Sequence, residues 1–188
     1  MVLLIRQGND DAFEQIFDKY KNEAVRTAYL ITGKKSICED IAQEAFIKCY
    51  KHIGKLKNPA GFRAWFLRIL TRTAWKYGRE AGRETPAENI FEKAGQAGLE
   101  LTARQYFTFE ENRRLYAEIG LLEKKLKTVI VLYYFNGLST KEIAKATGCL
   151  EGTVKSRLFT ARKRLKSRLE IFYSTEKEKD ADAACKVV

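Results

Sequence analysis

One stretch of the sequence carries long cations, hydroxyls and an aromatic ring at helical spacing. After Gly148, apolar residues recur every three or four positions and predict a helix, whose buried stripe is Val154, Leu158, Ala161, Leu165 and Leu169. The opposite face offers Lys155, Ser156, Phe159, Thr160, Arg162, Lys163 and Lys166. Long cations can reach phosphates and guanine edges, hydroxyls can bond base edges, and apolar groups can meet thymine methyls. This face therefore suits the major groove of DNA.

The elements around this helix predict how it is positioned. Ser139-Thr140-Lys141-Glu142 is a capping box that opens a short helix, and Gly148 supplies the left-handed residue that ends it. Helix, tight turn and longer helix form the pattern of a DNA-binding helix-turn-helix. Helix pairs with no DNA role share this pattern, and basic helices are often merely solvated. The charge of residues 111–172, 14 basic against 6 acidic, favours the DNA-binding interpretation.

A second basic helix is predicted nearer the N-terminus. Asn58-Pro59 reads as an N-cap followed by a first-turn proline. The helix that follows has Phe62, Trp65, Phe66, Ile69 and Leu70 on one side and Arg63, Arg68, Arg72, Lys76 and Arg79 on the other. Before it, a helical run ends at Gly33, and Ser36 with Glu39 suggests another capping box, which opens a helix with its apolar stripe at residues 37–53.

Composition indicates a helical protein with a polyanionic partner. The 188 residues hold 35 Lys and Arg against 24 Asp and Glu, a net charge of +11, and only 2 prolines. Charge is +6 over residues 1–80, −2 over 81–110, +8 over 111–172 and −1 beyond. We therefore expect an all-α protein with two small helical domains, 1–80 and 111–173, a flexible linker 81–110, and a disordered polar tail 174–188.

Several other classes of protein are disfavoured. The apolar run at residues 1–5 is too short for a signal peptide or a membrane helix. The four cysteines form no C-x-x-C pair and His52 is the sole histidine, so we expect no metal, no cofactor, and reduced thiols in a cytoplasm. Paired metal-binding carboxylates, phosphate-binding glycine motifs and a histidine partner for a cysteine nucleophile are also missing, so we expect no enzyme.

The two basic blocks resemble known sequences. VIVLYYFNGLSTKEIAKATGCLEGTVKSRLFTARKRLKSRL (Val129–Leu169) resembles region 4 of bacterial sigma-70-family factors, especially the small extracytoplasmic-function (ECF) group. DIAQEAFIKCY (Asp40–Tyr50) and NPAGFRAWFLRIL (Asn58–Leu70) resemble regions 2.2 and 2.3 of that family. The resemblance covers nearly everything except the linker and the tail.

The resemblance implies a promoter-specificity subunit of RNA polymerase, which we expect to be monomeric, with core RNA polymerase and promoter DNA as partners. An anti-sigma factor, often membrane-bound in this family, is a further implied partner. The implied contacts with core polymerase are Asp40, Gln43, Glu44 and Phe46. Those with the −10 element, which the protein would help to melt, are Lys57, Asn58, Phe62, Trp65, Arg68, Arg72, Lys76 and Arg79. Those with the −35 element are Lys155, Ser156, Arg157, Phe159, Thr160, Arg162, Lys163 and Lys166.

The sequence departs from the family pattern at four positions. Arg72 and Lys76 stand where Asn and Asp are frequent, Leu150 replaces a frequent Ser at the start of the recognition helix, and Thr160 replaces an Arg within it. The promoter bases of other members are therefore not transferable. Two rival interpretations stay open at this point: a stand-alone helix-turn-helix regulator, which would bind DNA tightly without polymerase, and a nucleic-acid-processing enzyme, which would turn over its substrate.

Overall fold

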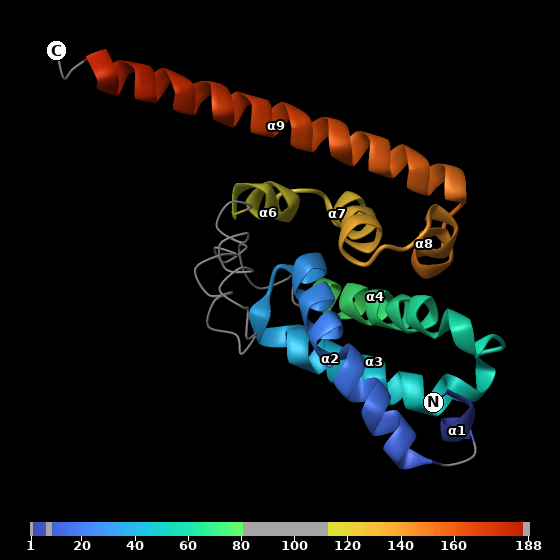
Figure 1. Ribbon diagram of the computed structural model, residues 1–188. Coiled ribbons are helices and arrows are strands. Elements are labelled where there is room, and N and C mark those ends of the chain that lie inside the picture. The colour runs from blue at the N-terminus through green and yellow to red at the C-terminus, as the bar shows by residue number, and fades with distance from the viewer. Residues whose placement is uncertain (1, 7–8, 81–112, 186–188) are drawn as a thin grey trace.

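The computed structural model describes residues 2–6, 9–80 and 113–185, and every regular element in these ranges is helical. Figure 1 shows two layers, with α2, α3 and α4 below and α6 to α9 above. The prediction of an all-α protein with two helical modules is confirmed. The predicted linker, 81–110, lies outside the described residues.

The N-terminal module is a bundle around a core rich in aromatic rings. Its elements are α1 (Val2–Arg6), α2 (Asp10–Thr32), η1 (Lys35–Ile37), α3 (Cys38–His52), η2 (Ile53–Lys55), η3 (Pro59–Gly61) and α4 (Phe62–Glu80). The side chain of Asn9 caps α2 at its start, and Gly33 ends it in the left-handed conformation with φ 73°. As predicted, Asn58 caps the turn that leads into α4, with Pro59 at its first position.

The capping box predicted at Ser36 is wrong. Ser36 lies inside the short η1 turn and is exposed, while α3 begins at Cys38 after Ile37, which makes no side-chain cap. The Cys38 thiol donates instead to the Lys34 carbonyl, at 2.9 Å. Because the 3₁₀ turn places Ile37, and not Ser36, directly before α3, the serine does not stand at the N-cap position of that helix.

The C-terminal module contains α6 (Arg113–Gly120), α7 (Lys124–Ile130), the π-helical turn η6 (Val131–Phe135), α8 (Thr140–Thr147) and α9 (Glu151–Cys185). The long α9 packs across α6, α7 and α8 and then projects beyond them (Figure 1). It continues to Cys185, through most of the segment expected to be a disordered tail. No proline or glycine interrupts the sequence after Gly152, so nothing in the chain stops the helix.

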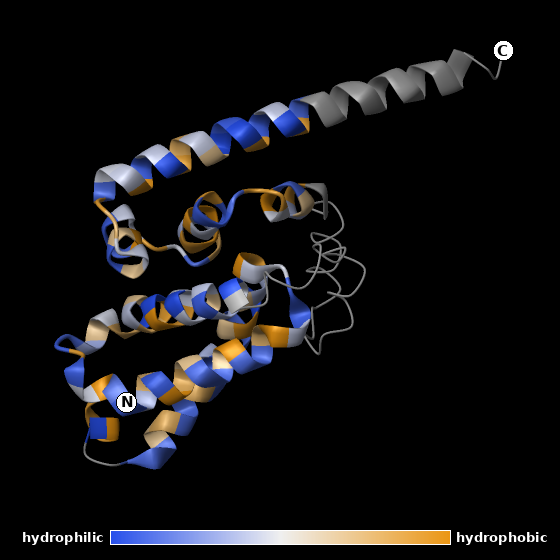
Figure 2. Cartoon of the chain, turned by 180° about the vertical axis from the view of Figure 1, so that it is seen from behind, coloured by the Kyte–Doolittle hydropathy of each residue, from blue (hydrophilic) through white to orange (hydrophobic). Residues whose placement is uncertain are grey.

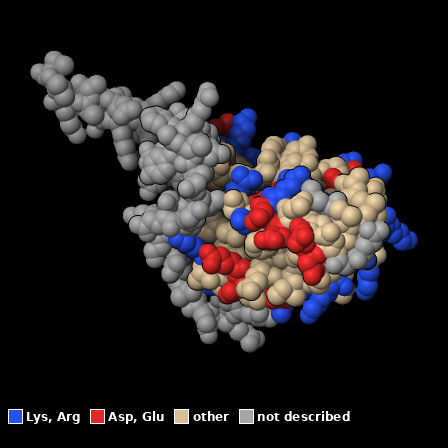
Figure 3. Space-filling model, turned by 60° about the horizontal axis from the view of Figure 1, so that its bottom comes forward, with Lys and Arg blue, Asp and Glu red and all other residues tan. Residues whose placement is uncertain are grey.

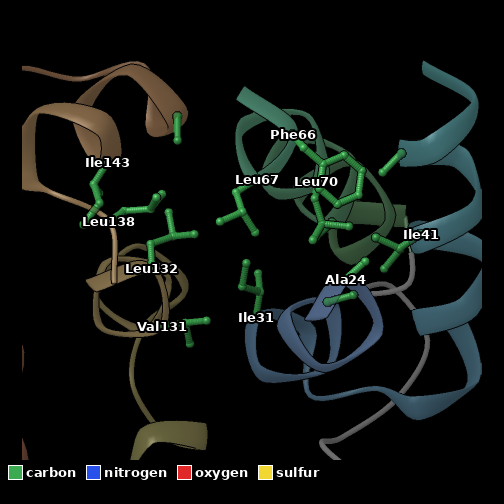
Figure 4. Close-up of a cluster of buried hydrophobic side chains, with 14 of the residues drawn as sticks. Ala24, Ile31, Ile41, Phe66, Leu67, Leu70, Val131, Leu132, Leu138 and Ile143 are labelled. Carbon is green, nitrogen blue, oxygen red and sulfur yellow. The ribbon is translucent and has the colours of Figure 1, made fainter. Parts of the chain in front are cut away.

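The two modules share a continuous apolar interior. α4 packs against α2 and α3 on one side and against α8 on the other. Figure 4 shows Leu132 and Leu138 of the C-terminal module turned toward Leu67 of α4, and all three side chains are buried. Hydrophilic residues predominate along the coloured part of α9, residues 151–170, whose outer side faces solvent (Figure 2). α4 is thus an interior helix, whereas α9 lies at the surface.

Candidate nucleic-acid interface

The turn before α9 has the geometry that the sequence predicts. Ser139 accepts a hydrogen bond from the Glu142 N–H, and Glu142 accepts one from the Ser139 N–H, which completes the capping box. The Ser139 hydroxyl also donates to the Glu142 carboxylate at 2.7 Å, and this bond first and the bond from the Ser139 N–H second hold the pKa of Glu142 below its usual value. Gly148 ends α8 in the left-handed conformation, with φ 69°. α8 and α9 therefore form the predicted helix-turn-helix.

Glu151 joins the two helices of this motif. The Thr140 hydroxyl of α8 donates to its carboxylate at 2.8 Å, and Lys155 of α9 pairs with the same oxygen at 3.1 Å. Both interactions lower the pKa of Glu151. The carboxylate lies in the first turn of α9, where the helix dipole favours negative charge. This contact anchors the start of α9 although Leu150, which stands in place of a capping serine, is 79% exposed.

The face of α9 predicted to read the −35 element is open. Val154, Leu158, Ala161 and Leu165 are buried against the module, as predicted, whereas Leu169, the last residue of the predicted stripe, is only half-buried. Away from them, the ring of Phe159 is 69% exposed. The structure brings together on one exposed surface Lys155, Ser156, Phe159, Arg162, Lys163 and Lys166. Cations and a free aromatic ring are thus presented side by side.

Two members of the predicted −35 set are less exposed. Thr160 is half-buried on the flank of α9. Arg157 is half-buried because it reaches back to the turn, where its Nη1 lies 3.5 Å from the sulfur of Cys149. The Thr147 hydroxyl lies 3.2 Å from the same sulfur. Arg157 therefore stands at the junction of the turn and the helix, apart from the exposed row.

The residues predicted for the −10 element divide between the surface and the core. Lys57 and Asn58 precede α4 and are exposed, and the Asn58 side chain accepts from the Ala60 N–H at 3.0 Å. On α4 itself the exposed cations are Arg72, Lys76 and Arg79, while Trp65 and Arg68 are half-buried. Phe62 is only 5% exposed and packs on Phe66 and Tyr20. Its ring belongs to the core, so Trp65 is the aromatic residue of this set that remains available.

The residues predicted for polymerase binding divide in the same way. Asp40 and Gln43 are exposed on α3. Phe46 is 4% exposed, and its ring lies against Phe13, Phe17 and Phe66 in the core.

Glu44 is bound within the molecule. It pairs with Lys48 at 2.5 Å and with Lys76 of α4 at 3.7 Å. Hydrogen bonds from Lys48 and Tyr77, in that order, lower its pKa. Glu44 therefore connects α3 to α4 in this structure. Its neighbours on α3 contribute exposed carboxylates, and Figure 3 shows a face of this cationic chain on which Asp and Glu gather.

Sequence reasoning missed a set of polar residues between the modules. Arg63, assigned to the basic side of α4, donates from Nη1 to the backbone carbonyl of Asn136 at 2.5 Å and pairs with Glu23 of α2. The indole of Trp75 donates to the Thr128 hydroxyl at 3.0 Å. Asn136 directly follows the η6 turn, and its side-chain amide donates to Glu23 and Thr27 of α2. No local pattern signals these pairs, because their members lie 40 to 113 positions apart.

The described side chains offer little other chemistry. Burial raises the pKa of Cys38 and Cys49 to about 12, so neither thiol is poised as a nucleophile. Within the described ranges, the His, Cys, Asp and Glu residues form no cluster of three that could hold a metal ion. Over the same ranges, no helix has the length and apolarity needed to cross a membrane.

Comparison with protein families gives two matches. Residues 16–84 match Sigma-70 region 2, and residues 112–165 match Sigma-70, region 4. The chain is 29% identical over 178 residues to the ECF RNA polymerase sigma-E factor of Haemophilus influenzae, with 90% of this chain and 94% of the relative covered. It is 28% identical over 178 residues to the RNA polymerase sigma-H factor of Pseudomonas aeruginosa, with 90% and 92% covered.

Two solved structures have the same fold. CnrH in complex with the cytosolic domain of CnrY matches with a TM-score of 0.66 and 22% identity, over 90% of this chain and 95% of that one. The sigma factor RpoE in complex with the anti-sigma factor NepR, from Bartonella quintana, matches with a TM-score of 0.66 and 23% identity, over 85% and 98%. Both similarities span the two modules described above.

Proposed function

Since this chain belongs to the sigma-70 family and is an ECF sigma factor of RNA polymerase, we propose how its residues divide the work of promoter recognition. The N-terminal module, 1–80, binds core polymerase and the −10 element, and the C-terminal module, 111–173, reads the −35 element. The observation that carries this proposal is the open face of α9, where four exposed lysines and arginines accompany the exposed ring of Phe159.

Recognition of the −35 element is assigned to α9. The buried stripe fixes the helix on its module, so that Lys155, Arg162 and Lys163 face outward together. Phosphate contacts fix the register of a helix in the groove, and contacts with base edges provide specificity. Phe159 supplies apolar surface for thymine methyl groups. With Thr160 on the flank in place of a frequent Arg, we expect a base preference that differs from better-known members.

Opening of the −10 element is assigned to α4 and the turn before it. Extruding a base costs a few kcal/mol, and stacking on an aromatic side chain recovers ~1–3 kcal/mol per base. Trp65 is the half-buried ring that can provide such a platform, and Lys57 and Asn58 stand exposed at the start of the helix. Arg68, Arg72, Lys76 and Arg79 then follow the backbone of the separated strand, with extra positive charge at 72 and 76 strengthening the phosphate contacts.

Binding to core polymerase is assigned to the outer side of α3. Asp40 and Gln43 are free to contact a partner, and the surrounding carboxylates suit a basic surface. Glu44 contributes indirectly, because it holds Lys48 and Lys76 and so fixes α3 on α4. We assign the monomeric chain no catalytic activity and a cytoplasmic location. We also propose that an anti-sigma factor restrains it, as NepR is found bound to RpoE.

Run-off transcription tests the function directly. Bacterial core polymerase is incubated with a library of promoter fragments, with and without the protein. Discrete starts that depend on the protein are the expected result, and their sequences give both promoter elements. No starts, together with tight and selective binding of the free protein to duplex DNA, would replace the proposal with a stand-alone regulator.

Two variants separate the proposed roles in the same assay. Trp65→Ala should impair transcription from duplex promoters and spare a template with a pre-melted bubble, since only opening needs the aromatic platform. Gln43→Ala combined with Asp40→Ala should abolish co-elution with core polymerase while leaving binding to −35 duplexes intact. Equal defects of Trp65→Ala on both templates would assign that ring to the core, and unchanged co-elution would remove the role from α3.

A further inference from the structure

Two ion pairs hold the second half of α9 on the elements that precede the helix-turn-helix. Arg164 donates from Nη1 to the Glu123 carboxylate at 2.6 Å, and Arg168 donates from Nη1 to the Glu118 carboxylate at 3.4 Å. Glu118 lies in α6, and Glu123 stands directly before α7, where its side chain makes no cap. The two pairs therefore join α9 to a part of the C-terminal module that is distant in the sequence.

The two carboxylates differ in their exposure. The side chain of Glu118 is only 4% exposed, whereas that of Glu123 is 69% exposed. Removing one partner of a buried ion pair is strongly destabilising, but an exposed pair contributes little. The hydrogen bond from Arg164, and second the charge of Arg164, lower the pKa of Glu123. Glu118 is thus the stronger anchor of α9, and Glu123 is the weaker one.

The apolar packing of α9 weakens where these pairs stand. Val154 and Leu158, in the first half of the packed stripe, are at most 1% exposed. Leu165 is 8% exposed, and Leu169 is half-buried. Polar contacts therefore contribute a growing share of the hold on α9 along this part of the helix.

The two arginines lie away from the face that we propose for DNA. Successive residues of an α-helix are rotated by about 100°, because about 3.6 residues complete a turn. On this spacing, Arg164 and Arg168 lie on one flank of the buried stripe, and Lys155, Phe159 and Lys166 lie on the other. The arginines can therefore keep their carboxylates while the opposite flank enters a major groove.

We infer that Glu118 and Glu123 are positioning residues for the −35 element, which act through Arg168 and Arg164 and do not contact DNA themselves. The inference rests on the proposed function, in which α9 reads that element. Phosphate and base contacts have to be made in one register along the whole face. A helix held by these pairs at one end and by α8 at the other presents this register before it meets DNA. Its apparent affinity falls with the fraction of molecules in which it is displaced.

Exchanging the charges of the exposed pair tests positioning against direct DNA contact. Glu123→Arg and Arg164→Glu each break the pair, and the double variant restores it with the charges exchanged. Both side chains are exposed, so these variants should fold. The matched control is Lys125→Glu, which reverses an exposed charge two positions after Glu123. Among the described side chains, no hydrogen bond joins Lys125 to α9.

Binding to promoter DNA is measured with the full-length protein and core polymerase. The probes are a promoter fragment found by run-off transcription and the same fragment with its −35 element scrambled. We expect each single variant to weaken the −35-dependent part of the affinity severalfold, and the double variant to recover most of it. Lys125→Glu should keep the wild-type ratio between the two fragments. Glu118→Gln should lower this ratio further, by roughly tenfold, because the charge-assisted bond of the buried anchor is lost.

The outcomes separate the positioning role from its alternatives. A double variant as weak as Arg164→Glu, with the salt slope of binding lowered by about one, would assign Arg164 to a phosphate and overturn the inference. Wild-type ratios in the Glu118→Gln and Glu123→Arg variants would overturn it as well, while the proposed function stands. Wild-type protein that gives no starts with core polymerase would instead overturn the proposed function, and this inference with it.

Discussion

α4 and α9 are both basic, amphipathic and assigned to DNA, but they occupy opposite environments. α4 is packed on one side by α2 and α3 and on the other by α8, and its Arg63 and Trp75 are bound to other elements. α9 packs by one stripe only and presents the rest to solvent, with Phe159 69% exposed. A basic helical face is therefore a ready DNA-binding surface only where the helix packs along a single side, even if a cation such as Lys155 pairs within the same helix.

This difference has a consequence for substitutions. Residues of α4 pack in the bundle and against α8, and we propose that some of them also contact the −10 element, so we expect a change there to alter stability and function together. Residues on the outer face of α9 are exposed, so we expect a change there to affect the proposed DNA binding and to leave the fold nearly unchanged. The following predictions measure that separation.

The largest expected effect is the loss of stability when a phenylalanine of α4 is replaced by alanine, compared with the same replacement in α9. Phe66→Ala in α4 removes a ring that is 0% exposed and packed on Phe46 and Phe62. It should lower the free energy of unfolding by about 3–5 kcal/mol. Phe159→Ala in α9 should change it by less than ~0.5 kcal/mol and yet weaken binding to −35 duplexes. Chemical denaturation and DNA titration measure both quantities, and similar stability losses would contradict the contrast between the helices.

The next effect is on DNA affinity. Lys155→Ala on α9 should weaken binding to a −35 duplex by ~1–3 kcal/mol if the lysine contacts a base edge, with loss at one base position. If it contacts a phosphate, the loss is uniform across sequences and the salt slope falls by about one. Lys51→Ala removes the same charge from an exposed site on α3 and should leave the titration unchanged. Loss of both DNA affinity and co-elution with polymerase would refute a role confined to DNA.

Two glycines near the start of α9 test how the helix-turn-helix is formed. Gly148 has φ 69°, a conformation that costs an L-residue about 1–2 kcal/mol, so Gly148→Ala should destabilise the protein by roughly that amount. A Cβ on Gly152 would meet nothing within 4 Å, and Gly152→Ala should stabilise α9 by up to ~1 kcal/mol. Thermal unfolding measures both. A stable Gly148→Ala variant with intact −35 binding would show that the turn tolerates another conformation.

Local chemistry explains which features could be predicted from the sequence. Gly33, Gly148 and the capping box at Ser139 depend on interactions within a few residues, and the structure has all three. The apolar stripe of α9 follows from helical spacing alone. Phe46 and Phe62 lie on helices whose apolar side is wide. The spacing of the apolar residues therefore does not distinguish a ring that is buried in the core from a ring that is exposed to a partner.

The residues between the modules were not predictable in this way. Asn136 and Glu23 are 113 positions apart, and each has an ordinary local role in the sequence, one at a helix end and the other on a helix surface. Only the docking of the two modules gives Arg63, Trp75 and Lys124 their partners. Helix faces can be inferred from periodicity, whereas the pairing of two faces depends on shape and distant contacts.

The smallest effect distinguishes two serines with the same sequence signature. Ser139→Ala removes a completed capping box and should cost about 1 kcal/mol, whereas Ser36→Ala changes an exposed side chain of η1 and should cost nearly nothing. Hydrogen bonds from Ser139 lower the pKa of Glu142 in the folded protein, so their contribution is full above the unfolded pKa of about 4.3 and is lost as pH falls through the folded value. The stability difference between Ser139→Ala and wild type should therefore shrink in acid, while Ser36→Ala follows wild type at every pH. Denaturation series at neutral pH and near pH 3 measure this, and equal costs for the two serines would mean that sequence pattern, without backbone geometry, determines the cap.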